Sequence, residues 1–238
     1  MRYKLGDAPF QGSGRGVRVA VIDSGVDPDN PHIGSIAGGV AIADNGDEHD
    51  DLLDRLGHGT AVIAAIQEKA PGAEIYAVKV FETVLTTRAA NIAAGIDWAA
   101  RNGMQVANLS LGTVSEDSEA LLSVALERAH AADLLVVSVH THRGARWWPG
   151  SLPGAVGVVA DESCPRDEIR LSADGTGQPL VAASPLPRPI AGIPQERNIS
   201  GISFAVANAT GFLARAIEAS GGPNMPPEVA RALARPLP

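Results

Sequence analysis

Asp23, His58 and Ser203 are the residues of this 238-residue chain whose types and settings fit covalent catalysis. A serine hydroxyl becomes a nucleophile when an imidazole accepts its proton and a carboxylate orients that imidazole. Ser203 follows Gly201 at the start of an alanine-rich run, and a helix N-terminus there would stabilise negative charge on a reacting oxygen. His58 stands between two glycines, which allow other backbone or a substrate to approach closely. Together the three residues predict a nucleophilic serine site.

Each of these residues also has an ordinary structural interpretation. Ser203 would serve as a helix N-cap, which is the usual role of a serine at a helix start. Asp23 would be a turn residue that closes a strand, and His58 a histidine whose hydrogen bonds are satisfied at a helix start. Because all three residue types occur in matching settings in one chain, the catalytic interpretation is favoured over three separate structural ones.

The elements that must position these residues alternate between strands and helices, which predicts an α/β fold with three α/β/α layers and a mostly parallel central sheet. Asp23 lies at the carboxyl end of the first buried strand, the edge where functional groups gather in such sheets. Strands are expected at residues 17–22, 73–80, 106–111, 134–139, 155–159 and 179–182, and helices at 61–66, 89–102, 116–132, 203–219 and 226–234. We expect a single domain over 1–238, with its core at about 17–221 and a tail, 222–238, that carries the last short helix.

Composition narrows the function classes. The net charge of −8 argues against a nucleic-acid-binding surface, and no apolar run is long enough to cross a bilayer. The single cysteine, Cys164, excludes an internal disulfide, and residues 1–16 contain no apolar segment typical of a secretory signal, so a cytoplasmic location is expected. Residues 44–54 include six acidic side chains, but their spacing does not fit an EF-hand. We interpret them as a solvated loop and expect no metal or cofactor.

Five short segments in one order resemble the subtilisin-like serine peptidase family (subtilases). They are Val-Ile-Asp-Ser-Gly (21–25), Gly-His-Gly-Thr (57–60), Tyr-Ala-Val-Lys-Val (76–80), Asn-Leu-Ser-Leu-Gly (108–112) and Gly-Ile-Ser-Phe-Ala (201–205). The resemblance covers roughly residues 17–221. The order Asp, His, Ser is one of several in which this catalytic geometry occurs.

The resemblance implies a role for each matching residue. Ser203 would be the nucleophile, His58 the general base, and Asp23 the carboxylate that holds the imidazole tautomer. The stretch Ser110-Leu111-Gly112 would pair with an extended peptide or protein substrate as an added strand. The backbone N–H of Ser203 would be one donor of the oxyanion hole.

Some positions depart from the family pattern. His142 stands where the family usually has an oxyanion-hole asparagine, and Ile202 replaces the usual threonine before the serine. An imidazole can donate a hydrogen bond, but its reach and direction differ from those of an amide; alternatively His142 is a surface-loop residue. Trp147 falls where the family usually has a small residue in the primary specificity pocket, so it would restrict that pocket to a small side chain or close it. Arg143 lies nearby, either to attract an acidic group or as a solvated loop arginine.

Three functions fit these observations. The first, which we favour because Asp23, His58 and Ser203 occur together, is a serine endopeptidase of narrow specificity, such as one that matures a particular peptide. The second is a pseudoenzyme that keeps the fold and binds an extended peptide, as the substitutions at positions 142, 147 and 202 suggest. The third is an acyl transferase that uses the same triad with an amine in place of water. No calcium-binding insertion follows the helix that starts near His58 and no pro-segment is visible in the sequence, so we expect the chain to resemble the compact, intracellular subtilases. No oligomeric state is predicted.

Overall fold

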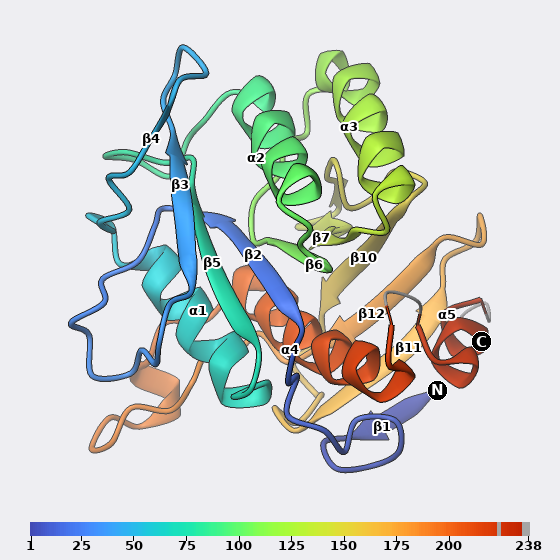
Figure 1. Ribbon diagram of the computed structural model, residues 1–238. Helices are drawn as coiled ribbons and strands as arrows, with labels where there is room; N and C mark the ends of the chain where they lie inside the picture. The colour runs from blue at the N-terminus through green and yellow to red at the C-terminus, as the bar shows by residue number, and fades with distance from the viewer. Residues whose placement is uncertain (223–224, 235–238) are drawn as a thin grey trace.

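The computed structural model describes residues 1–222 and 225–234, and it has three layers, with helices on both faces of a central sheet (Figure 1). The predicted α/β/α architecture with a mostly parallel sheet is therefore confirmed. The parts of the predicted tail at 223–224 and 235–238 lie outside the described residues.

Within the described residues the main sheet has the strand order β1-β11-β12-β10-β7-β6-β2-β5-β3-β4. The run from β12 to β3 is parallel throughout, and the pairs β1–β11, β11–β12 and β3–β4 are antiparallel. These strands are β1 (Arg2–Lys4), β2 (Arg18–Asp23), β3 (Gly38–Ile42), β4 (Glu48–His49), β5 (Glu74–Lys79), β6 (Val106–Leu109), β7 (Leu135–Val139), β10 (Ala155–Ala160), β11 (Glu168–Ala173) and β12 (Pro179–Ala183). A separate hairpin consists of β8 (Thr141–His142) and β9 (Ala145–Arg146).

The helices bury the two faces of the sheet in two apolar clusters. On one face lie α1 (His58–Lys69) and α4 (Ile202–Ser220), together with the short α5 (Pro227–Leu233). On the other lie α2 (Ala89–Arg101) and α3 (Glu119–Ala131), which follows a 3-10 turn at Glu116–Ser118. Residues 204–214 of α4 are buried without a break, as its nearly continuous apolar sequence predicts.

The predicted helices and all the predicted strands are present within three residues of their expected bounds. The sequence pattern did not predict β1, β3, β4, β11 or the β8–β9 hairpin. These strands are short or lie toward the edges of the sheet, and their sequences are rich in glycine or charge. Their pairing is set by neighbouring strands more than by their own hydrophobic periodicity.

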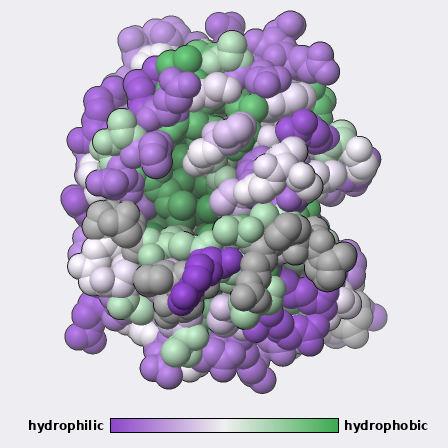
Figure 2. All heavy atoms as spheres, turned by 90° about the vertical axis from the view of Figure 1, so that its right-hand side faces the viewer, coloured by the Kyte–Doolittle hydropathy of each residue, from purple (hydrophilic) through white to green (hydrophobic). Residues whose placement is uncertain are grey.

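Polar and apolar residues separate as expected for a globular domain. On the face shown in Figure 2, hydrophilic residues cover most of the periphery, while apolar atoms are visible in a central hollow. Across the described part of the chain, no helix combines the length and apolar character needed to span a membrane.

Candidate active site

The three predicted catalytic residues lie where a strand ends or a helix begins, at the carboxyl ends of the parallel strands. Asp23 is the last residue of β2, His58 is the first residue of α1, and Ser203 is the second residue of α4. The glycine after His58 is required by packing, because a Cβ at Gly59 would collide with the backbone oxygen of Gly25. The head of α1 therefore lies directly on the turn that follows β2, which brings His58 to Asp23.

The carboxylate of Asp23 orients the imidazole of His58. Nδ1 of His58 lies 2.7 Å from Oδ1 of Asp23, whose side chain is fully buried. Because a carboxylate accepts hydrogen bonds, this contact places the proton of a neutral imidazole on Nδ1 and leaves Nε2 free to accept one. The backbone N–H of Ser24 donates to the same carboxylate oxygen at 2.8 Å, which holds the group in place.

The environment of His58 makes the imidazole a stronger base than usual. Burial lowers its pKa, but the hydrogen bond to Asp23 and the negative charges of Asp23 and Asp54 raise it more, so the net pKa is raised above the ordinary value of 6.5. A raised pKa favours the imidazolium that forms when a serine proton is taken up.

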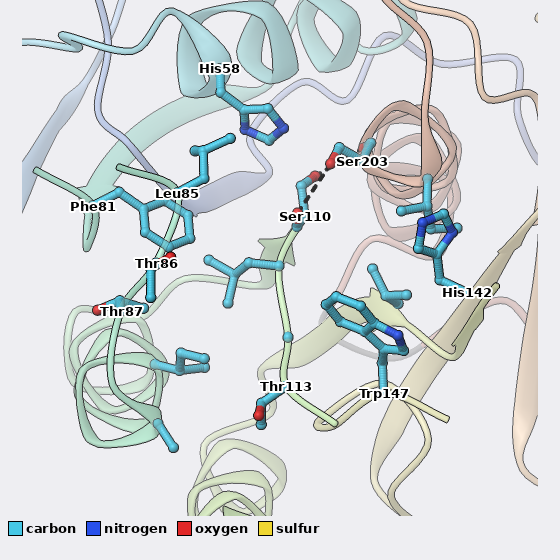
Figure 3. A pocket seen from close by; sticks show the side chains of 16 residues that line it. His58, Phe81, Leu85, Thr86, Thr87, Ser110, Thr113, His142, Trp147 and Ser203 are labelled. Carbon is cyan, nitrogen blue, oxygen red and sulfur yellow. Dashed lines mark hydrogen bonds between the residues drawn. The ribbon is translucent and has the colours of Figure 1, made fainter. Parts of the chain in front are cut away.

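Ser203 and Ser110 are joined by two reciprocal hydrogen bonds. The hydroxyl of Ser203 donates to the backbone oxygen of Ser110 at 3.2 Å, and the hydroxyl of Ser110 donates to the backbone oxygen of Ser203 at 2.9 Å. Figure 3 shows His58 and Ser203 at one cavity, with the hydroxyl of Ser203 directed to Ser110. Among the described residues this hydroxyl bonds to Ser110 and not to His58, so it must be redirected toward His58 before a proton can be transferred; catalytic hydrogen bonds often form fully only with substrate bound.

The cavity has a volume of about 420 Å³, and Ser110, Leu111 and Gly112 form part of its lining. Ser110–Gly112 continue from the carboxyl end of β6, and Thr113 pairs with Trp148 as an isolated antiparallel bridge. A side chain at Gly112 would collide with this neighbour, because a Cβ there would lie 2.6 Å from the backbone oxygen of Trp148. The predicted substrate-binding stretch thus lines the cavity beside Ser203.

Trp147 fills space between this stretch and the β8–β9 hairpin. A Cβ at Gly112 would lie 3.2 Å from Cε3 of the Trp147 ring, and the ring centroids of Trp147 and His142 are 6.0 Å apart at an angle of 73°. Figure 3 shows the indole between the Ser110–Thr113 segment and His142. The backbone of Trp147 is held by its N–H bond to the oxygen of His140 and by the Ser151 hydroxyl. The indole therefore lines the cavity on the side of His142, and its assignment to the primary specificity pocket stays a prediction from the sequence.

The hairpin separates His142 from Arg143. His142 lines the cavity, whereas Arg143 and Gly144 form the two-residue turn, with φ values of 51° and 79°. Positive φ at both central positions is typical of a tight hairpin turn. The chain therefore reverses direction at Arg143 and Gly144. Arg143 is exposed at the tip of the hairpin and outside the cavity lining, so the structure does not bring it together with the other predicted site residues.

Two parts of the site were not predicted from the sequence. Phe81 and Leu85 line the side of the cavity away from His142 (Figure 3), Ile92 is also part of the lining, and only their apolar character was visible in the sequence. The prediction that residues 44–54 form a solvated loop is wrong for Asp54, which is only 9% exposed. Its position shortly before the helix that begins at His58 was the one sequence feature that pointed to a capping role.

The described residues do not form a recognisable metal-binding site. Among residues 1–222 and 225–234, no cluster of three or more histidine, cysteine or acidic side chains is placed to hold a metal ion.

Comparisons with known proteins place this geometry in a family. The chain is 33% identical to Subtilisin Savinase from Lederbergia lenta over 209 residues, which is 83% of this chain and 72% of that protein. It is 35% identical to a thermostable alkaline protease from Halalkalibacterium halodurans over 181 residues, or 68% of this chain and 48% of that protein. Several of these relatives are thus matched over only about half their length, as is an alkaline protease from Shouchella clausii at 51%.

The fold agrees with these relatives. The crystal structure of a cold-adapted subtilisin-like serine proteinase superposes with a TM-score of 0.67 at 24% sequence identity, and it covers 89% of this chain and 78% of its own. The predicted subtilisin-like architecture is therefore confirmed. The model of the subtilase family matches residues 14–235, nearly the whole chain. The chain belongs to the subtilase family.

Proposed function

We propose that this protein is a serine endopeptidase that cleaves peptide bonds through an acyl-enzyme formed on Ser203. The observation that carries the proposal is the 2.7 Å contact between His58 Nδ1 and Asp23 Oδ1, which leaves Nε2 of His58 facing the cavity that Ser203 lines. Family membership and the alkaline proteases among the relatives support the same activity.

Each step follows from the residues at the cavity. An extended peptide pairs with the backbone of 110–112, and its N–H takes the oxygen of Ser110 that the hydroxyl of Ser203 occupies in the free protein. The hydroxyl then turns to Nε2 of His58, which accepts the proton as the oxygen attacks the peptide carbonyl. Asp23 stabilises the imidazolium, which next protonates the leaving amine. A water molecule, deprotonated by His58, hydrolyses the resulting ester and restores the serine.

The oxyanion of each tetrahedral intermediate needs donors near Ser203. The N–H of Ser203 has no carbonyl partner within α4, because it belongs to the first turn of the helix. This N–H and the positive end of the helix dipole provide one part of the hole. We assign the side-chain donor to His142, which lines the same cavity from the hairpin.

Trp147 gives the enzyme its narrow specificity. Its indole packs over Gly112, where the side chain next to the attacked carbonyl would have to enter. We therefore propose that the residue on the acyl side of the cleaved bond is glycine or alanine. The cavity is also lined by the apolar side chains of Phe81, Leu85 and Ile92. These select apolar side chains at peptide positions farther from the cleaved bond.

Fluorophosphonate labelling of the wild type, Ser203→Ala and His58→Ala tests the activity. Labelling of the wild type alone requires an activated serine and supports the proposal. Absence of labelling in the wild type would overturn it in favour of a peptide-binding protein without catalysis. For an active protein, product masses recorded with and without an added amine distinguish hydrolysis from acyl transfer, since only transfer yields the amide adduct.

A further inference from the structure

We propose that Asp54 is a positioning residue for the catalytic base, a second buried carboxylate that holds the backbone on both sides of His58 and adds negative charge beside it. The proposal rests on the function assigned to His58 above. Asp54 does not touch the imidazole. It acts through the loop that precedes α1 and through the residue that follows Asp23.

Both oxygens of Asp54 are held by donors from the head of α1 and the segment before it. Oδ1 accepts the backbone N–H groups of Leu56 and Gly57 at 2.9 and 2.8 Å. Oδ2 accepts the backbone N–H and the hydroxyl of Thr60 at 2.9 and 2.7 Å. The carboxylate therefore satisfies the N–H of Thr60, which the first turn of α1 leaves without a partner, and two N–H groups on the other side of His58.

A further hydrogen bond connects Asp54 to the other half of the catalytic pair. The hydroxyl of Ser24 donates to Oδ1 of Asp54 at 2.9 Å and accepts the N–H of Gly59 at 2.9 Å, while the N–H of Ser24 donates to Asp23. One buried group thus links the end of β2 to the start of α1. The contact between Asp23 and His58 spans this same junction.

The charge of Asp54 is retained despite burial. Burial alone would raise its pKa, but the hydrogen bonds from Thr60, Leu56 and Ser24 lower it more, so the net pKa lies below the ordinary 3.8. The charges that act on His58 come from Asp23 at the end of β2 and from Asp54 before α1. From α4, His58 faces the uncharged Phe204 and Ser203, and His142 lines the cavity from β8.

The test compares Asp54→Asn with Asp47→Asn in the full chain. Asp47 is an exposed acid of the same acidic segment, so its variant makes the same change in net charge without touching the hydrogen bonds around His58. We expect Asp54→Asn to move the acid limb of the kcat/KM profile to lower pH. We expect kcat to fall roughly tenfold or more with little change in KM, a loss smaller than the roughly 10⁴-fold expected for Asp23→Asn. Asp47→Asn should leave both unchanged.

Thr60→Val provides a second variant that keeps the charge of Asp54 and removes the hydrogen bond from the Thr60 hydroxyl to it, together with the bond that this hydroxyl accepts from the N–H of Asp27. We expect a smaller fall in kcat and an unshifted acid limb, and Thr60→Ser should restore the wild-type kcat. If Asp54→Asn has the acid limb and kcat of Asp47→Asn, or if Thr60→Val has the kcat of the wild type, the proposal is overturned.

An NMR titration of the His58 imidazole separates this proposal from the proposed function. It is recorded with Asp54→Asn, Asp47→Asn and the wild type, and it needs no turnover. A lower titration midpoint in Asp54→Asn alone supports the positioning role even in a protein that cleaves nothing. The same midpoint in all three would refute it even in an active enzyme.

Discussion

Replacing Trp147 with glycine should convert a restricted primary pocket into an open one. In the wild type, a phenylalanine side chain next to the attacked carbonyl would have to share space with the indole that packs over Gly112. Overpacking of this kind costs about 1–3 kcal/mol. With the indole removed, burial of the phenyl group contributes about 1.5–3 kcal/mol. The two effects together correspond to about 2.5–6 kcal/mol. The kcat/KM for a phenylalanine peptide relative to an alanine peptide should therefore change by at least roughly 70-fold.

The quantity to measure is the ratio of kcat/KM for two peptides that differ only by phenylalanine or alanine at that position. We expect Trp147→Gly to raise this ratio by at least roughly 70-fold. Trp147→Phe should give a ratio between those of the wild type and Trp147→Gly. Trp148→Phe is the matched control, because Trp148 is buried beside Trp147 and is not part of the cavity lining. Thermal unfolding of each variant establishes that it is folded at the assay temperature.

An unchanged ratio in Trp147→Gly would refute the reasoning, since the indole would then lie outside the path of the substrate side chain. Equal increases in Trp147→Gly and Trp148→Phe would also contradict it. That result would show a general loosening of the segment around Pro149.

Further variants address the base, the oxyanion hole and stability. Asp23→Asn should lower kcat by about 10⁴-fold through the wrong imidazole tautomer, and retention of activity would contradict the triad. His142→Asn should raise kcat if the imidazole occupies the position of the oxyanion donor, because an asparagine amide is the usual donor there and its removal from a subtilisin lowers kcat by roughly 10²–10³-fold. A large fall in kcat would contradict this and would mean that the site is fitted to the imidazole. Because the pKa of His58 is raised, the acid limb of kcat/KM should lie above pH 6.5, and stability from its protonated form should be lost as pH rises through the folded pKa. At Asp174, burial raises the pKa, but hydrogen bonds from Thr176, Gln178 and His140 lower it more, to about 2. Asp174→Asn should therefore lower Tm at pH 7, and the difference from the wild type should vanish as pH falls from 3.8 toward 2; a difference that persists at pH 2 would contradict this cause.

The sequence by itself determined the layer architecture and the three residues at the centre of the site. Strand and helix periods, the glycines around His58 and the apolar run after Ser203 are local properties, so they can be recognised without knowledge of distant contacts. The five segments that resemble the subtilases then assigned an expected catalytic role to each of these three residues. For the same reason the main errors concern strands near the two edges of the sheet, such as β3 and β11, whose pairing depends on neighbouring strands.

Only the tertiary structure decided how the site is assembled around those residues. The hydroxyl of Ser203 meets the oxygen of Ser110, which is 93 positions away in the chain, and the indole of Trp147 packs over Gly112. The acidic segment looked uniformly solvated in the sequence, yet Asp54 is buried because the head of α1 and the segment before it offer its carboxylate several backbone donors. Arg143 turns outward because the hairpin reverses there. Such outcomes depend on which surfaces meet when the layers pack, and packing is not encoded in any local pattern.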